Sequence, residues 1–211
     1  PIDLTDRPAF YDADSNLVTT MNNLEEGKVV LVRSFYSNGL NLLKELHVHL
    51  KKKLPNKTYQ EQQIYRDTYR KLSHLILLEI VQHQLEVKKA PSIGWLEKLY
   101  PDTSEFHLPI PQVQGLNSSW QWYKKGISIP VLRNKIHPYY GTYFPTRFDH
   151  LEVFDNYLER YEGPKKAAYD IGTGSGVLAL QMTKYGFQKV SGTDVNPNAI
   201  FGLKEFMGET K

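Results

Sequence analysis

From Leu40 onward, hydrophobic residues recur three or four positions apart, which is the spacing of one helix face. The apolar residues of this predicted face are Leu40, Leu43, Leu46, Leu50 and Leu54. Pro55 ends the pattern, and Thr58 with Glu61 then forms a capping-box pattern at the start of a second helix. We expect that second helix to continue to about Lys89, and a short third helix to run from Ser92 to Leu99.

Residues 101–130 show a different pattern. Residues 101–115 contain three prolines, which disfavour a helix. Residues 120–123 are mostly aromatic, residues 127–130 include two isoleucines, and a glycine-containing turn separates them, which is typical of a β-hairpin. The sequence therefore predicts a helical N-terminal domain over residues 1–115 and a β-hairpin connector over residues 116–141.

From residue 142 the predicted elements alternate between helix and strand. Thr146 is expected to cap a helix that reaches Tyr161, and residues 167–171 form a short apolar run typical of a buried parallel strand. A helix over 177–185 and a strand over 189–193 follow. Asn196 then caps another helix, with Pro197 at its first position. The order βαβα is the opening of a doubly wound α/β sheet, so we expect residues 142–211 to form the first part of a Rossmann-like domain.

Gly172, Gly174 and Gly176 lie where the first of these strands turns into a helix. Without side chains, the backbone can turn sharply there and a ligand can lie against it. The start of the following helix offers free N–H groups. Asp194 ends the next strand, and its carboxylate can accept hydrogen bonds from both hydroxyls of a ribose. These features predict an adenosine-containing ligand at adjacent strand ends.

The spacing of the glycines bears on which ligand this is. Dinucleotide sites use G-x-G-x-x-G, whereas here the third glycine comes one residue early and Val177 takes its place. Asp170 precedes the first glycine, and a carboxylate there suits a cationic ligand with an amino acid group and opposes a pyrophosphate. A purely structural glycine turn would need neither Asp170 nor Asp194.

The segment D-x-G-x-G-x-G closely resembles motif I of the class I S-adenosylmethionine-dependent methyltransferases, and Asp194 resembles their ribose-binding acid. The resemblance implies S-adenosylmethionine (SAM) as cofactor and methyl transfer as the reaction. The cofactor-binding residues that it implies in this segment are Asp170, Gly172, Thr173, Gly174, Gly176, Asp194 and Val195.

The order of helices, hairpin and proline-containing segment is similar to that of the release-factor glutamine methyltransferases (the HemK type). This resemblance implies that Phe144, Pro145 and Thr146 lie over the methionine part of the cofactor. That family also carries an Asn-Pro-Pro-aromatic motif, which holds the nitrogen to be methylated. The motif does not occur in this sequence, so no catalytic residue is assigned. We therefore expect the chain to be the N-terminal portion of a longer protein and to be inactive alone.

Composition removes several other classes of protein. The 211 residues include no cysteine, which excludes disulfides, a thiolate zinc site and a cysteine nucleophile. The seven histidines form no H-x-x-x-H pair, so no metal is expected. No apolar run approaches the ~18 residues of a membrane helix, and we expect a cytoplasmic protein without membrane contact.

The net charge of +3 names no partner by itself, but two segments bear on the question. Residues 51–53 are three lysines, which most often mark a solvated helix end and otherwise contact phosphates or an acidic protein. Residues 120–143 interleave aromatic and basic residues, and such a segment could stack unpaired bases. We favour the alternative that these aromatic residues form the core of the hairpin and one wall of the cofactor site. We expect a protein or RNA acceptor, bound through the N-terminal domain and methylated on nitrogen. The alternative is a non-catalytic SAM-binding or protein-interaction module.

Overall fold

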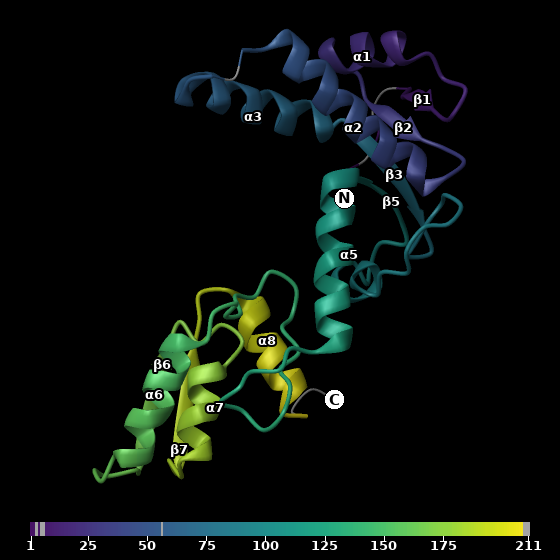
Figure 1. Cartoon of the computed structure of the whole chain (residues 1–211). Coiled ribbons are helices and arrows are strands. Elements are labelled where there is room, and N and C mark those ends of the chain that lie inside the picture. Colours follow the sequence, from purple (N-terminus) through teal and green to yellow (C-terminus); the bar gives the residue numbers. More distant parts are fainter. Residues whose placement is uncertain (3, 5–6, 56, 209–211) are drawn as a thin grey trace. The chain divides into compact units, whose positions relative to one another are not determined.

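A computed structural model describes residues 1–2, 4, 7–55 and 57–208. The chain divides into two compact units, Pro1–Asn117 and Ser118–Lys211, which are described separately (Figure 1). Lys211, the predicted end of the Rossmann-like portion, lies outside the described residues.

The first unit is built on a 5-stranded mixed sheet. Strands β1 (Ala9–Tyr11), β2 (Val30–Val32) and β3 (Ile76–Val81) are parallel neighbours in that order. Strands β4 (Gln84–Leu85) and β5 (Glu105–Pro109) both pair with β3 in the antiparallel direction. The first unit is thus mixed α/β, and the prediction of a helical domain over residues 1–115 is wrong.

Strand β3 explains that error. The second predicted helix continued to Lys89, but the helix ends at Ser73 and Ile76–Val81 is the central strand of the sheet. Ile76, Leu77 and Leu78 are completely buried. A strand covered on both faces has a continuous apolar run, which periodicity alone cannot distinguish from a buried helix.

The helices of the first unit agree better with the sequence pattern. Helix α1 (Leu17–Glu25) precedes β2, and α2 (Tyr36–Lys53) contains the predicted leucine face except for Leu54, which is its C-cap. Helix α3 (Tyr59–Ser73) begins with the predicted capping box of Thr58 and Glu61 and packs against α2 (Figure 1). Helix α4 (Trp95–Leu99) is shorter than predicted, and its N-cap is Gly94 rather than Ser92.

The predicted β-hairpin is wrong, because residues 120–123 lie in helix α5 (Ile110–Lys125). Pro111 sits in the first turn, where a proline costs no intrahelical hydrogen bond. Gly126, with a φ of 67°, follows the last residue, as glycine often does at helix ends. In place of the predicted hairpin, Ile127 and Ile136 form a single antiparallel bridge.

The second unit has the predicted alternation of elements. Helix α6 (Asp149–Arg160) has Phe148 rather than Thr146 as its N-cap. It is followed by β6 (Ala167–Ile171), α7 (Val177–Lys184), β7 (Lys189–Thr193) and α8 (Pro197–Phe206). Strands β6 and β7 are parallel, and Asn196 caps α8 ahead of Pro197. This βαβα arrangement is the mixed α/β order expected of a Rossmann-like domain.

Two kinds of feature are absent from the described residues. No helix in that part of the chain is long and apolar enough to cross a membrane. No group of three or more His, Asp or Glu side chains there is arranged to hold a metal ion.

Candidate functional site

The glycine-rich loop connects the carboxyl end of β6 to α7, beside the carboxyl end of β7. Ile171 and Thr193 are partners in the last register position of the two strands. The backbone N–H groups of Gly172 and Thr173 both donate to the Thr193 carbonyl, at 2.8 and 2.9 Å. The loop is therefore fixed to β7 at the strand ends, where ligands bind in open α/β sheets.

All three glycines of the loop have left-handed backbones, with φ of 75° at Gly172, 51° at Gly174 and 78° at Gly176. Other residues adopt such angles only at a cost. The space around the glycines differs. A Cβ at Gly174 would lie 3.0 Å from the Tyr143 carbonyl oxygen, and one at Gly176 would lie 2.4 Å from a Leu203 methyl group. A Cβ at Gly172 would meet nothing within 4 Å. Gly174 and Gly176 thus face protein, whereas Gly172 faces open space.

Asp194 is held against this loop by backbone amides. Its Oδ2 accepts a hydrogen bond from the Gly174 N–H at 2.8 Å, and its Oδ1 accepts one from the Asn196 N–H, also at 2.8 Å. The bonds from Asn196 and Gly174 lower the pKa of the Asp194 carboxyl. An ionised carboxylate has further lone pairs, so the partly exposed Asp194 can accept additional hydrogen bonds from a ligand.

Asp170 and Thr173 face inward. Asp170 is 7% exposed, and its Oδ2 accepts hydrogen bonds from the Thr173 hydroxyl at 2.7 Å and the Ala179 N–H at 3.2 Å. The Ala179 N–H is one of the free amides in the first turn of α7. These contacts make Asp170 an anchor between the loop and α7. Its predicted contact with a cofactor stays a prediction.

The segment before α6 contacts the glycine loop through Tyr143. The Tyr143 carbonyl accepts a hydrogen bond from the Ser175 N–H at 3.1 Å, and its side chain is exposed. Phe144 packs on the apolar cluster that includes Leu151, Pro145 is buried, and Thr146 is exposed. The three residues predicted to cover the methionine part thus lie beside the loop, and their cofactor contacts stay predictions.

Two asparagines fix this segment in place, and the sequence analysis missed their role. The side-chain amide of Asn196 donates to the Gly141 carbonyl at 2.9 Å, and that of Asn198 donates to the Tyr140 carbonyl at 3.0 Å. Both asparagines lie at the start of α8. The only signal in the sequence was the N-cap pattern at Asn196, which indicates a helix start but not a contact 55 residues away.

Exposed apolar side chains surround the strand ends. Val195 directly follows Asp194 and is fully exposed, and Ile171 is 78% exposed. An apolar surface beside a carboxylate suits a flat base attached to a ribose, because the base can lie on the former while its sugar hydroxyls bond the latter. Val195 is therefore accessible to a ligand, and its predicted contact with the cofactor stays a prediction.

Helix α7 is anchored on its other side to α6. Asp155 accepts hydrogen bonds from the Lys184 ammonium at 3.0 Å, the Tyr185 hydroxyl at 2.8 Å and the buried Gln181 amide at 3.2 Å. Burial opposes ionisation of Asp155, but the hydrogen bonds from Lys184, Tyr185 and Gln181 outweigh it and lower its pKa. This ionic contact holds the C-terminal part of α7 against α6.

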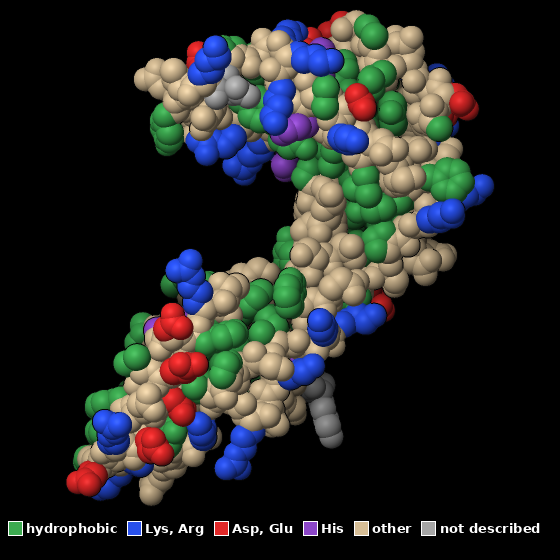
Figure 2. Space-filling view, viewed as in Figure 1, with side chains coloured by type: hydrophobic (Ala, Val, Ile, Leu, Met, Phe, Trp, Pro, Cys, Tyr) green, Lys and Arg blue, Asp and Glu red, His purple; other side chains and the backbone are tan. Residues whose placement is uncertain are grey.

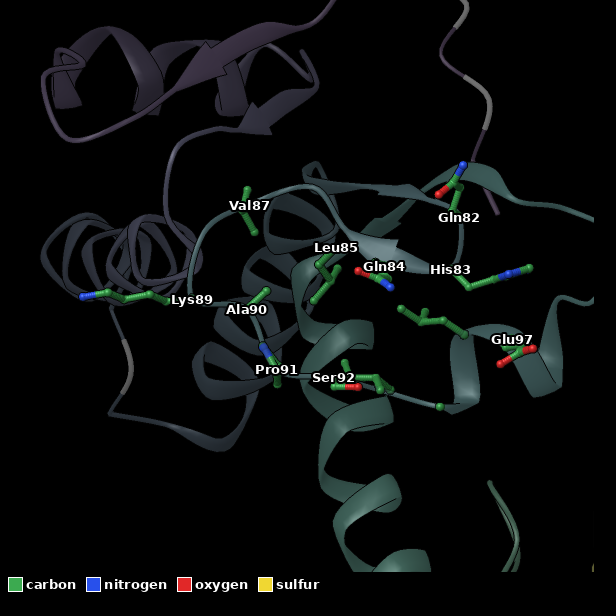
Figure 3. A pocket seen from close by; sticks show the side chains of 13 residues that line it. Gln82, His83, Gln84, Leu85, Val87, Lys89, Ala90, Pro91, Ser92 and Glu97 are labelled. Atoms are coloured by element: carbon green, nitrogen blue, oxygen red, sulfur yellow. The ribbon is translucent and has the colours of Figure 1, made fainter.

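A separate cavity of about 510 Å³ lies in the first unit (Figure 3). Gln82, His83 and Gln84 of the β3–β4 hairpin line one side, and Ser92 and Glu97 line the other. The His83 ring is bonded through Nε2 to the Tyr100 carbonyl at 2.9 Å. Because a carbonyl only accepts, His83 serves there as a donor. The lining includes neutral amides and is without the strand-end geometry of the glycine loop, so the glycine loop is the stronger candidate for the functional site.

Comparisons with known proteins match the same region. A family model described as ribosomal protein L11 methyltransferase (PrmA) matches residues 151–205. A relative of that name from Clostridium perfringens is 44% identical over 48 residues, which is 23% of this chain and 15% of the relative. One from Geobacter metallireducens is 50% identical over 36 residues, 17% of this chain and 12% of the relative. One from Nitrosomonas europaea is 41% identical over 44 residues, 21% of this chain and 14% of the relative.

The chain thus spans only a small part of the length of the curated relatives it matches. The family match begins at Leu151, after the segment that resembles the release-factor enzymes, so that finer resemblance stays a prediction. For the region that contains the glycine loop, the similarity supports a class I S-adenosylmethionine-dependent methyltransferase.

Proposed function

We propose that the glycine loop and Asp194 bind SAM and that the protein transfers its methyl group to a protein acceptor. The observation that carries the proposal is the arrangement at the ends of β6 and β7. There Gly172 faces open space, and the N–H of Gly174 on the same loop donates a hydrogen bond to the Asp194 carboxylate. An adenosine fits these two features together, because its ribose offers two hydroxyl donors to one carboxylate.

The residues present fit SAM in charge as well as in space. Bound SAM would supply an electrophilic methyl group on a sulfonium. Gly172 leaves room for the ligand to approach the backbone, and Asp194 holds the ribose hydroxyls. Asp170 positions the loop through Thr173 and Ala179. The contribution of these residues is alignment, which can supply ~7–11 kcal/mol of barrier reduction in favourable cases.

A dinucleotide fits less well. Tyr143 and Leu203 already occupy the space in front of Gly174 and Gly176. Of the three glycines, only Gly172 leaves the backbone open to the close approach that a pyrophosphate needs. The loop also carries no cationic side chain, and the ionised Asp194 lies against it. We therefore expect SAM and not NAD.

The acceptor is inferred from the relatives. Their common name states methylation of a ribosomal protein, and protein nitrogen is also the acceptor implied by the sequence resemblance. We propose a protein nitrogen as the methylated atom. The residues that hold the acceptor are not among those assigned to the glycine loop.

The experiment is a transfer assay with SAM carrying a labelled methyl group, a ribosomal protein extract and the whole protein that contains these 211 residues. We expect label on a protein band with the native whole protein, none with its Asp194→Ala variant, and none with the 211-residue chain, which is expected to be inactive alone. The protein must first be shown to bind SAM by calorimetry. SAM binding by the whole protein without any transfer to a protein acceptor would contradict the proposed methyl transfer, and absence of SAM binding would contradict the proposed cofactor.

A further inference from the structure

Three cations of the α2–α3 hairpin in the first unit lie away from the acidic side chains that the structure describes. Among the described residues, Lys44, Lys51 and Arg70 have no carboxylate oxygen within 4.0 Å. The acids of α3 are already engaged: Glu61 accepts hydrogen bonds from the backbone at the start of the helix, and Asp67 accepts them from Gln63. Figure 2 shows Lys and Arg side chains gathered over α2 and α3, with histidine between them.

Aromatic rings lie among these cations. His47 of α2 packs edge-on against Tyr65 and Tyr69 of α3, with ring centroids 5.8 and 5.9 Å apart. Lys44 and Lys51 are three residues before and four residues after His47, so they share its helix face.

The outer ridge of α3 continues the pattern. Tyr59 is 76% exposed, and the Arg66 guanidinium lies 5.9 Å from the centre of its ring. The residues of this surface, which we call the aromatic–basic face, are Lys44, His47, Lys51, Tyr59, Tyr65, Arg66, Tyr69 and Arg70.

We propose that the aromatic–basic face binds single-stranded RNA. Unneutralised lysines and arginines attract phosphates, and exposed rings stack on unpaired bases. A duplex keeps its bases stacked inside, whereas unpaired RNA presents them to aromatic side chains. An acidic peptide would pair with the cations alone, whereas an unpaired oligonucleotide would also stack a base on the exposed Tyr59 ring. This binding goes beyond methyl transfer and does not depend on it.

The test is fluorescence anisotropy of a labelled oligouridylate of about 12 nucleotides, titrated with the whole 211-residue chain at several salt concentrations. We expect saturable binding that weakens with salt. Lys44→Gln with Lys51→Gln should weaken it about tenfold and reduce the slope of log K against log salt by about 1.4, or about 0.7 for each lost phosphate contact. Tyr59→Leu should weaken it by at least about fivefold through lost stacking.

The matched control is Lys28→Gln with Lys53→Gln, which removes the same charge from lysines already paired with Glu26 and Glu25 at 2.8 and 2.7 Å. It should leave RNA affinity within about twofold. Circular dichroism confirms that each variant is folded. An equal loss in both double variants, or native affinity in the first, would overturn the proposal. So would a poly-glutamate peptide that competes as well as RNA while Tyr59→Leu has no effect. A negative result for RNA would not contradict the proposed SAM binding, because Asp194→Ala tests SAM binding separately.

Discussion

At the scale of single residues, the three glycines of the loop serve different purposes although all have left-handed backbones. The conformation alone costs a residue with a Cβ about 1–2 kcal/mol. The neighbours that a Cβ would meet at each glycine decide whether a substitution also costs packing or ligand binding. Gly176 faces Leu203 within the protein, and Gly172 faces open space that we assign to the ligand.

This difference gives a paired prediction. Gly176→Ala should destabilise the fold by more than the backbone cost alone, because its Cβ overlaps Leu203. Gly172→Ala should lose only about 1–2 kcal/mol of stability but weaken SAM binding at least tenfold. Urea unfolding measures the first effect and calorimetry the second. Gly172→Ala with native SAM affinity would remove the space at Gly172 from the cofactor site.

At the scale of elements, the position of α7 depends on Asp155 of α6. Asp155→Asn should lower the free energy of unfolding by about 1–3 kcal/mol at pH 7, because a charged hydrogen-bonding partner of Lys184 and Tyr185 is lost. The pKa of Asp155 is lower in the folded protein, so its stabilisation is present above the unfolded pKa of about 3.9 and is lost as pH falls through the folded value.

Urea unfolding of the native and Asp155→Asn proteins at pH 7 and near pH 3 checks this. The difference between them should shrink at the lower pH. Glu159→Gln on the same helix serves as the control, since Glu159 is exposed. A difference that grows on acidification would show that the ionic contact does not stabilise α7.

The elements also show what the sequence could and could not predict. The positions of strands β6 and β7 and the cap at Asn196 were predicted correctly, because each has a local signal: a short apolar run, a glycine turn or an N-cap followed by proline. The expected burial of β6 was wrong, because Asp170 alone among its five residues is buried. Strand β3 was missed because its central place in the sheet comes from pairing with β2 and β5, which lie far away in the sequence. Helix α5 was missed because Pro111 and the aromatic residues 120–123 suggest other structures until the first-turn position of the proline is known.

In the site, too, some features could be predicted from the sequence and others could not. The glycines and Asp194 could be found from spacing alone, because parallel strands bring their carboxyl ends together. The contacts from Asn196 and Asn198 to residues 140–141 could not, since they depend on how the preceding segment crosses the loop. The inward direction of Asp170 was equally out of reach, because a carboxylate on a strand can face either side of the sheet.

At the scale of the whole molecule, the two units carry separate proposals, RNA binding in the first and SAM binding in the second. We predict that Lys44→Gln with Lys51→Gln leaves SAM affinity within about twofold, and that Asp194→Ala leaves RNA affinity within the same range, because changes with no shared partners act independently. Calorimetry and anisotropy on the same protein samples check both. A loss of both affinities in either variant would show that one unit's change disturbs the other unit.

The most direct test of the central claim is a calorimetric titration of the 211-residue chain with SAM and, separately, with NAD. The account predicts saturable binding of one SAM, no detectable heat from NAD at the same concentrations, and at least about tenfold weaker SAM binding in Asp194→Ala, which lacks the charged acceptor for the ribose hydroxyls. NAD binding as tight as SAM binding, or native SAM affinity in Asp194→Ala, would contradict it.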